Sequence, residues 1–218
     1  MWKEKLSKNG YVFIENYKPG YTVLDVASEV GDISLLPGVR PSQQLIPRVK
    51  TKHGPNTYSG IYGLDEFPLH TDLAHWFLPP RYLLLRCVKG SASVSTRICD
   101  SKEIIKVFGE ETLSRVLVRP RRPVKCNGYL LRVFEKNIYG FSLFRWDEKF
   151  IIPASKNSKI IFQKLLDTIK KSVFDEIFLV SSGDTLLIDN WRMLHGRSSI
   201  PKEGMSRHIE RVYLEGIK

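Results

Sequence analysis

Phe67-Pro68-Leu69-His70-Thr71-Asp72 is the stretch of sequence from which the rest of the chain is interpreted. Residues 67–73 are predicted to form a strand, and side chains two apart in a strand point to the same face. His70 and Asp72 are therefore expected to lie side by side as two ligands of one metal. A third candidate ligand, His195, follows His70 by 125 residues. Two histidines and one carboxylate with open positions opposite are the ligand set of non-haem Fe(II) oxygenases.

A His-x-Asp triplet alone is a weak signal, because a structural histidine is its commoner explanation. The sequence around the third candidate ligand strengthens the signal. The turn Gly183-Asp184, an apolar strand and Asp189-Asn190 precede His195-Gly196-Arg197. Two arginines four residues apart, Arg207 and Arg211, follow. Packing alone does not explain this combination, which favours a metal site.

Length and composition are those of a globular protein with one domain spanning residues 1–218. The chain has 218 residues, of which 42% are hydrophobic and 26% charged. No apolar run reaches the ~18 residues of a membrane span, and no signal-peptide core follows Met1. The three cysteines, Cys87, Cys99 and Cys126, are widely spaced and show neither zinc spacing nor a disulfide framework. We therefore expect a cytoplasmic protein, because the reducing cytoplasm leaves cysteines free and would also help to keep iron as Fe(II).

The net charge of +11 favours an acidic partner, which would be nucleic acid, an anionic small molecule or a membrane surface. Part of the excess is concentrated in one segment that contains Arg115, Arg119, Arg121, Arg122 and Lys125. A solvated basic loop is the simpler explanation of that segment. It shows no ladder of stacking aromatic residues and no named nucleic-acid motif.

Apolar patterning predicts a mainly β chain with flanking helices. The expected strands are 10–14, 67–73, 81–88, 92–98, 129–134, 138–144, 178–180, 185–189 and 207–214, and the expected helices are 22–30, 101–117 and 157–172. Residues 36–60 and 119–125 are expected to be loops. The first loop precedes the metal stretch and offers polar candidates for substrate contact, each more typical of a structural role: Gln43, Gln44, Arg48, Asn56, Tyr58 and Ser59.

Many short strands separated by turns predict an antiparallel sandwich or barrel. A jelly roll suits the proposed ligands, because it brings an early strand and a late strand to the same barrel mouth. That arrangement would explain how His70 and His195 meet despite their separation in sequence.

Three motifs together resemble the taurine dioxygenase-like (clavaminate synthase-like) family of Fe(II)- and 2-oxoglutarate-dependent oxygenases. They are Tyr62-Gly63 through Asp72, Pro79-Pro80-Arg81-Tyr82-Leu83-Leu84-Leu85, and Gly183 through Arg197. Residues 9–40 also resemble the N-terminal portion of the family. The resemblance implies a double-stranded β-helix (jelly roll) fold, Fe(II), the cosubstrate 2-oxoglutarate, and O2.

The resemblance also implies roles for individual residues. His70, Asp72 and His195 match the iron ligands of the family. Arg207, which follows His195 by 12 residues, is close to the usual place of the arginine that binds the distal carboxylate of 2-oxoglutarate. A guanidinium suits this role, since it meets a carboxylate bidentately and keeps its charge. Arg211 stands where family members often place a second arginine, near the C1 carboxylate or the substrate.

Two further assignments leave alternatives open. Thr96 matches the family threonine whose hydroxyl assists Arg207, although Ser93 and Ser95 are close and the double glycine of the family is absent here. Arg197 competes for either arginine role, and its alternative is a structural salt bridge. An intact carboxylate at Asp72 favours hydroxylation, desaturation or cyclisation over halogenation.

The expected function is that of a dioxygenase hydroxylating an unactivated C–H bond of a small polar metabolite, such as an amino acid or related acid. The alternatives are an oxygenase acting on a macromolecule, either nucleic acid or peptide, and a non-catalytic jelly-roll binding module. His53, His75 and His208 fit a structural or surface role better than a ligand role.

Overall fold

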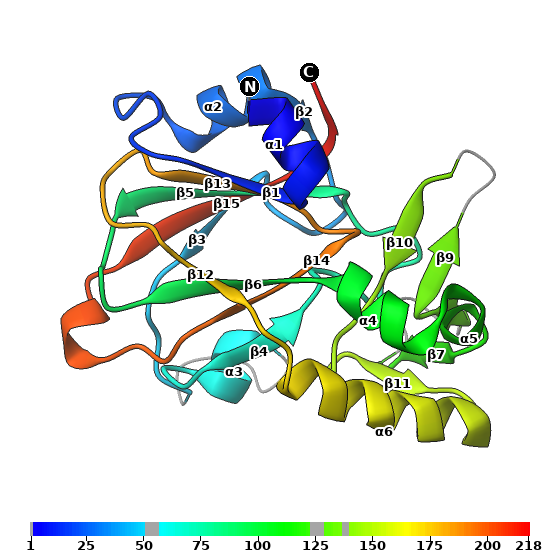
Figure 1. Ribbon diagram of the computed structural model, residues 1–218. Helices are drawn as coiled ribbons and strands as arrows, with labels where there is room; N and C mark the ends of the chain where they lie inside the picture. The colour runs from blue at the N-terminus through cyan, green and yellow to red at the C-terminus, as the bar shows by residue number, and fades with distance from the viewer. Residues whose placement is uncertain (1, 51–56, 123–128, 137–139) are drawn as a thin grey trace.

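The computed structural model describes residues 2–50, 57–122, 129–136 and 140–218, and its elements are organised around two antiparallel β-sheets (Figure 1). The larger sheet has the strand order β1-β13-β5-β15-β2, with β3 also paired to β15. Its strands are β1 (Tyr11–Ile14), β2 (Gly31–Ile33), β3 (Ser42–Leu45), β5 (Tyr82–Lys89), β13 (Thr185–Asp189) and β15 (His208–Ile217). The smaller sheet, β12-β6-β14-β4, contains β4 (Phe67–His70), β6 (Ser95–Asp100), β12 (Asp175–Phe178) and β14 (Met193–Arg197).

One hydrophobic core lies between the two sheets. Leu85 of β5 and Ile188 of β13 belong to the same buried cluster as Ile98 of β6 and Met193 of β14. The larger sheet is also covered on its outer face, where Leu84 of β5 packs in a second cluster with residues of the N-terminal helices. Because successive residues of a strand point to opposite faces, a strand covered on both sides is apolar throughout. The strand predicted at 81–88 is observed as β5 at 82–89, and its residues 83–87 are buried, including Arg86.

Helices cover the outer faces of both sheets. Helices α1 (Trp2–Asn9) and α2 (Val23–Val30) lie against the larger sheet (Figure 1). Helix α2 begins as predicted, because the Thr22 side chain accepts from the backbone N–H of Asp25 and the Asp25 carboxylate accepts from that of Thr22. Helices α4 (Ser101–Phe108), α5 (Glu110–Ser114) and α6 (Lys156–Lys170) contribute to a third cluster with residues of the smaller sheet, such as Leu69 and Leu194.

Short strands pack beside that third cluster. β7 (Leu117–Pro120) pairs with β8 (Leu131–Arg132) and β11 (Ile151–Pro153), while β9 (Phe134–Lys136) pairs with β10 (Ser142–Phe144). The two antiparallel sheets and the helices that cover them confirm the predicted mainly β architecture with flanking helices.

Several predicted boundaries were wrong. The single helix expected over 101–117 is divided at Gly109, whose φ of +81° lies outside the helical region. Residues 36–60 are not loop throughout, because they include β3 and most of α3 (Tyr58–Tyr62). Residues 119 and 120, expected to begin a loop, are the end of strand β7, and the strand expected at 178–180 ends at Phe178. Helix α1 and the 3-10 turn Lys202–Gly204 were not predicted.

Some sequence expectations concern residues that lie outside the described ranges. These are His53, Asn56, Lys125 and Cys126. Cys87 and Cys99 are free and buried. Within the described ranges, every helix is too short or too polar to cross a membrane.

Candidate metal centre and its pocket

The three predicted ligands meet between the two sheets. β4 pairs with β14, and His70 lies directly opposite His195 in the register of these strands. Asp72 follows two residues after the end of β4, and all three side chains are buried. Ligand atoms of these residues lie within 4.8 Å of one another, and no other such group of metal-binding side chains occurs in the described residues.

The reason given for the position of Asp72 was wrong, although the side chains do meet. The strand ends at His70, so strand alternation does not place Asp72. The Asn190 side chain holds the Asp72 backbone in place instead. Its side-chain oxygen accepts from the backbone N–H of Asp72 at 2.7 Å, and its amide donates to the carbonyls of Asp72 at 3.1 Å and Pro80 at 2.9 Å. The following residue, Leu73, has a φ of +56°, so the chain turns sharply after Asp72.

The distances from the Asp72 carboxylate to both histidines fit bonding to a single metal ion. Nε2 of His70 is 3.5 Å from Oδ1 of Asp72, and Nε2 of His195 is 3.7 Å from Oδ2. Two ligands bonded to one ion at about 2.1 Å lie no more than about 4.2 Å apart. Nδ1 of His70 lies 2.8 Å from the carbonyl oxygen of Pro68, which leaves Nε2 for a metal. Burial lowers the pKa of His195, which favours the neutral imidazole that metal coordination requires.

The Asp72 carboxylate is oriented by two side chains from β15. Nη1 of Arg211 donates to Oδ2 at 2.9 Å, and the Tyr213 hydroxyl donates to the same oxygen at 3.0 Å. Nη2 of Arg211 donates to the side-chain oxygen of Gln43. Burial raises the pKa of the Asp72 carboxyl, but Arg211 and the two histidines together hold it well below its usual value. Asp72 is therefore an anion at neutral pH.

Tyr58 supports His70 by stacking against its ring. The two rings stack with centroids 4.3 Å apart, and the Tyr58 hydroxyl donates to Asp147 at 2.8 Å. The backbone N–H groups of Lys149 and Phe150 also donate to Asp147, at 2.7 and 2.9 Å. Asp147 was not predicted from the sequence, and burial raises the pKa of its carboxyl.

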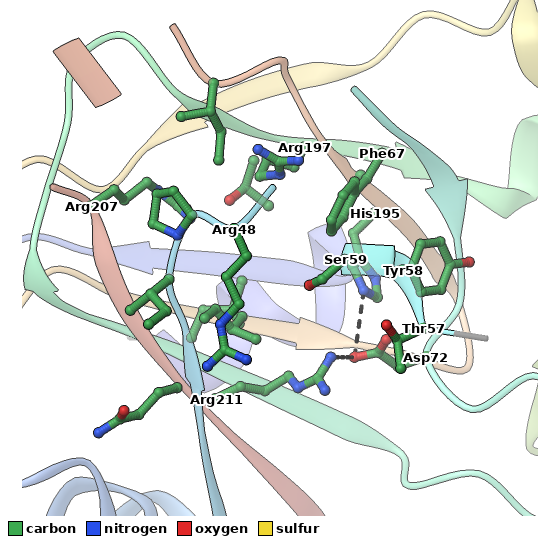
Figure 2. Close-up of a pocket in the computed structure, with 18 of the residues that line it drawn as sticks. Arg48, Thr57, Tyr58, Ser59, Phe67, Asp72, His195, Arg197, Arg207 and Arg211 are labelled. Atoms are coloured by element: carbon green, nitrogen blue, oxygen red, sulfur yellow. Dashed lines mark hydrogen bonds and ion pairs between the residues drawn. The ribbon is translucent and has the colours of Figure 1, made fainter. Parts of the chain in front are cut away.

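A pocket of about 280 Å³ opens beside the three ligands (Figure 2). Four arginines and one carboxylate line it, namely Arg48, Arg197, Arg207, Arg211 and Asp72. The remaining walls are largely apolar and include Leu45, Ile46, Pro47, Phe67, Leu83, Leu85 and Ile200. The pocket therefore combines a net positive charge with largely apolar walls.

Arg207 is a buried cation with no ion pair among the described residues. Its side chain lines the pocket and is buried, with the residue 5% exposed. Its Nε has no hydrogen-bond partner among the described residues. Burial lowers the pKa of Arg207 to about 10. A buried charge without a counter-ion is costly, so this position favours an anionic ligand.

Arg197 lies close to Arg207 but has partners of its own. It donates to the carbonyl oxygens of Gly63 at 3.0 Å and Asp65 at 2.7 Å, and its guanidinium lies 4.0 Å from the ring centroid of Phe67. Burial and the positive charge of Arg207 lower the pKa of Arg197 to about 10. These carbonyls take the place of the salt bridge considered for Arg197. Thr96 lies opposite Arg197 in the β6–β14 register and also lines the pocket.

The other candidates lie away from the ligand cluster. His75 follows in the turn after Asp72, where burial lowers its pKa, and His208 does not line the pocket. Among the described basic residues of the 115–125 segment, Arg115 pairs with Glu111 at 2.5 Å. None of the described residues of that segment lines the pocket. Tyr213 was missed, although it shares strand parity with Arg211.

Comparison with known proteins supports the resemblance seen in the motifs. No family model matches the chain. Clavaminate synthase 2 of Streptomyces clavuligerus is 27% identical over 164 residues, which are 66% of this chain and 48% of that protein. The chain therefore spans about half the length of this curated relative.

Solved structures share the fold. PvcB from Pseudomonas aeruginosa superposes with a TM-score of 0.68 at 16% identity, over 99% of this chain and 80% of PvcB. Asparagine oxygenase, solved with Fe(II), 3-hydroxyasparagine and succinate, gives 0.63 at 16% identity, over 85% and 60% of the two chains. The non-haem iron oxygenase OrfP, solved with Fe and α-ketoglutaric acid, gives 0.61 at 17%, over 85% and 60%. The predicted resemblance and the jelly-roll fold are confirmed.

Proposed function

We propose that this protein is an Fe(II)- and 2-oxoglutarate-dependent dioxygenase that hydroxylates a small polar metabolite, such as an amino acid or related acid. The buried cluster of His70, Asp72 and His195 carries this proposal, because its donor set is that of non-haem iron oxygenases. When bound, Fe(II) supplies the activation of O2 that lets an unactivated C–H bond be oxidised while 2-oxoglutarate is converted to succinate and CO2.

The protein's own residues prepare the metal site. Arg211 and Tyr213 fix the Asp72 carboxylate through one oxygen, and Asn190 fixes its backbone. Tyr58 restrains the His70 ring by stacking. Such supporting contacts orient ligands before the metal arrives and tune its affinity.

Arg207 is the proposed partner of the distal carboxylate of 2-oxoglutarate. It is buried, lacks a carboxylate partner among the described residues and lines the same pocket as the ligands. Arg197 adds positive potential beside it, and Thr96 is the proposed hydroxyl partner. Arg211 remains a candidate for contact with the C1 carboxylate, because Nη1 and Nη2 are engaged by Asp72 and Gln43 but its buried Nε has no partner among the described residues.

The size of the pocket favours a small substrate over a macromolecule. Its volume of about 280 Å³ lies just below the range of small-molecule sites, roughly 300–1,000 Å³. The solved relatives include oxygenases bound to hydroxylated asparagine and arginine. The basic segment that suggested a nucleic-acid partner contributes no described residue to this pocket.

We also propose a single domain and a reducing cytoplasmic location. The free, buried Cys87 and Cys99 are in keeping with such a location.

Turnover without a primary substrate tests the proposal. The protein is incubated in air with Fe(II), ascorbate and 2-oxoglutarate, and succinate is quantified. We expect slow succinate formation that requires iron and is lost in His70→Ala. Succinate formed equally by His70→Ala would show that this site is not its source. No succinate from folded, iron-loaded parent protein would favour a binding module.

A further inference from the structure

The pocket contains more positive charge than its expected occupants neutralise. Four arginines and one aspartate among its described lining residues give a net charge of +3. Fe(II) and the 2-oxoglutarate dianion together add no net charge. The occupied site would therefore still attract an anion.

Of the four pocket arginines, Arg48 alone has neither a hydrogen-bond or ion-pair partner among the described residues nor a proposed role in cosubstrate binding. Arg211 is paired with Asp72, and Arg197 donates to two carbonyls and faces the ring of Phe67. Arg207 is assigned to 2-oxoglutarate. Arg48 makes no side-chain hydrogen bond and no ion pair with the described residues, yet it lines the same pocket.

The position of Arg48 suits a ligand that enters the pocket beside the candidate metal ligands. Arg48 lies three residues after the end of β3, and the apolar residues just before it, Leu45, Ile46 and Pro47, also line the pocket. Its side chain is half-buried, whereas Arg207 is buried. Figure 2 shows Arg48 directed into the pocket, between Arg207 and the Asp72–Arg211 pair. A ligand held there would meet both an apolar wall and the metal ligands.

We infer that Arg48 binds a carboxylate of the primary substrate, so that the substrate is a small organic acid with an aliphatic body. This inference rests on the proposed function and deepens it by naming the substrate class. A guanidinium donates two parallel hydrogen bonds to a carboxylate, which fixes the distance and the orientation of the molecule attached to it. The aliphatic body lies against Ile46 and Pro47, and one of its C–H bonds faces the metal.

Replacing the carboxylate by a carboxamide provides a sharp probe. The amide is nearly isosteric, but it is neutral and presents one acceptor oxygen instead of two. A charge-assisted bidentate contact is stronger than a neutral one, so we expect a preference of at least about tenfold for the acid.

The experiment uses paired ligands on the anaerobic protein saturated with Fe(II) and 2-oxoglutarate. Calorimetry measures the affinity for L-amino acids and for aliphatic dicarboxylic acids of four to six carbons, each compared with the analogue in which one carboxylate is a carboxamide. The variants are Arg48→Gln and, as a matched control, Arg40→Gln, which removes an exposed arginine that does not line the pocket. The affinity for 2-oxoglutarate is measured for each.

We expect the parent and Arg40→Gln to bind at least one acid about tenfold or more tightly than its amide. Arg48→Gln should lose this preference and retain its affinity for 2-oxoglutarate. The inference is overturned if no acid in the panel binds, if acid and amide bind equally to the parent, or if the preference survives in Arg48→Gln. A loss of 2-oxoglutarate binding in Arg48→Gln would also overturn it, because Arg48 would then serve the cosubstrate. If the parent binds no 2-oxoglutarate at all, the proposed function itself fails, which is a different result.

Discussion

Replacing Arg207 by methionine should weaken 2-oxoglutarate binding and stabilise the ligand-free protein at the same time. Methionine keeps an unbranched apolar side chain in the buried site but removes the charge. Arg207 is 5% exposed and has no ion pair among the described residues. The lowering of its pKa from 12.5 to about 10 reflects the cost of burying that charge.

The two magnitudes follow from that environment. A pKa lowered from 12.5 to about 10 corresponds to about 3 kcal/mol of lost folding free energy when Arg207 is charged at neutral pH. For a chain of this size, each kcal/mol changes the melting temperature by about 2–4 °C, so Arg207→Met should melt several degrees higher. Truncating one partner of a buried charge pair costs about 2–5 kcal/mol of binding, so the Kd for 2-oxoglutarate should rise at least about thirtyfold.

Calorimetry with Fe(II) and 2-oxoglutarate under anaerobic conditions measures the binding effect, and thermal denaturation of the ligand-free protein measures the stability effect. Arg40→Met, an exposed substitution outside the pocket, is the matched control and should change neither quantity. Unchanged 2-oxoglutarate affinity in Arg207→Met would refute the assignment of Arg207 to the cosubstrate. A lower melting temperature in this variant would refute the conclusion that Arg207 is an uncompensated buried charge.

Three further predictions concern other residues. Tyr213→Phe removes one of the two donors to Oδ2 of Asp72, so iron affinity should fall about 10- to 100-fold in a competition titration with a chelator, and unchanged affinity would contradict the supporting role. Asn190→Ala deletes a fully buried side chain with three backbone hydrogen bonds, so the free energy of unfolding in urea should fall by about 2–4 kcal/mol; a loss below about 0.5 kcal/mol would contradict this account. Burial raises the pKa of the Cys87 thiol from 9.0 to about 11, which favours the neutral thiol in the folded state. The resulting contribution to folding stability is present below pH 9 and is lost as the pH rises toward 11. Because the thiol is buried and neutral, the Cys87 peptide should resist iodoacetamide at pH 8 until urea unfolds the protein. Rapid labelling of the native protein would contradict the burial of this thiol.

The candidate metal cluster could be predicted from the sequence because its members are chemically distinctive. His70 and Asp72 lie close together in sequence, and His195 stands in a motif with a turn, an apolar strand and a glycine. Their meeting was predicted correctly, but strand alternation did not cause it. Asp72 reaches His70 through a turn held by Asn190, and such a tertiary hydrogen bond leaves no periodic signal in the sequence.

The arginines illustrate what a motif cannot assign. Arg207 and Arg211 both line the pocket as expected, but only the structure reveals that Arg211 is paired with Asp72 while Arg207 lacks a described ionic partner. Arg197, Arg48 and Arg207 are indistinguishable by residue type. Their tasks depend on neighbouring carbonyls, rings and carboxylates contributed by segments far away in the sequence.

Errors in the fold fall on short elements. The long amphipathic helix and the apolar central strands were predicted well, because many side chains repeat the same pattern. Helix α3 and strand β3 have five and four residues, too few for periodicity to separate them from loop. The break at Gly109 was missed because apolar residues occur on both sides of it.

The most direct test of the central claim is the visible spectrum of the anaerobic protein after addition of Fe(II) and then 2-oxoglutarate. Chelation of the metal by the keto acid at the site formed by His70, Asp72 and His195 should give a weak charge-transfer band in the parent. His70→Ala, with an unchanged circular dichroism spectrum, should give none. A folded, iron-loaded parent without the band, or an equal band in His70→Ala, would contradict the assignment of this site as an iron and 2-oxoglutarate centre.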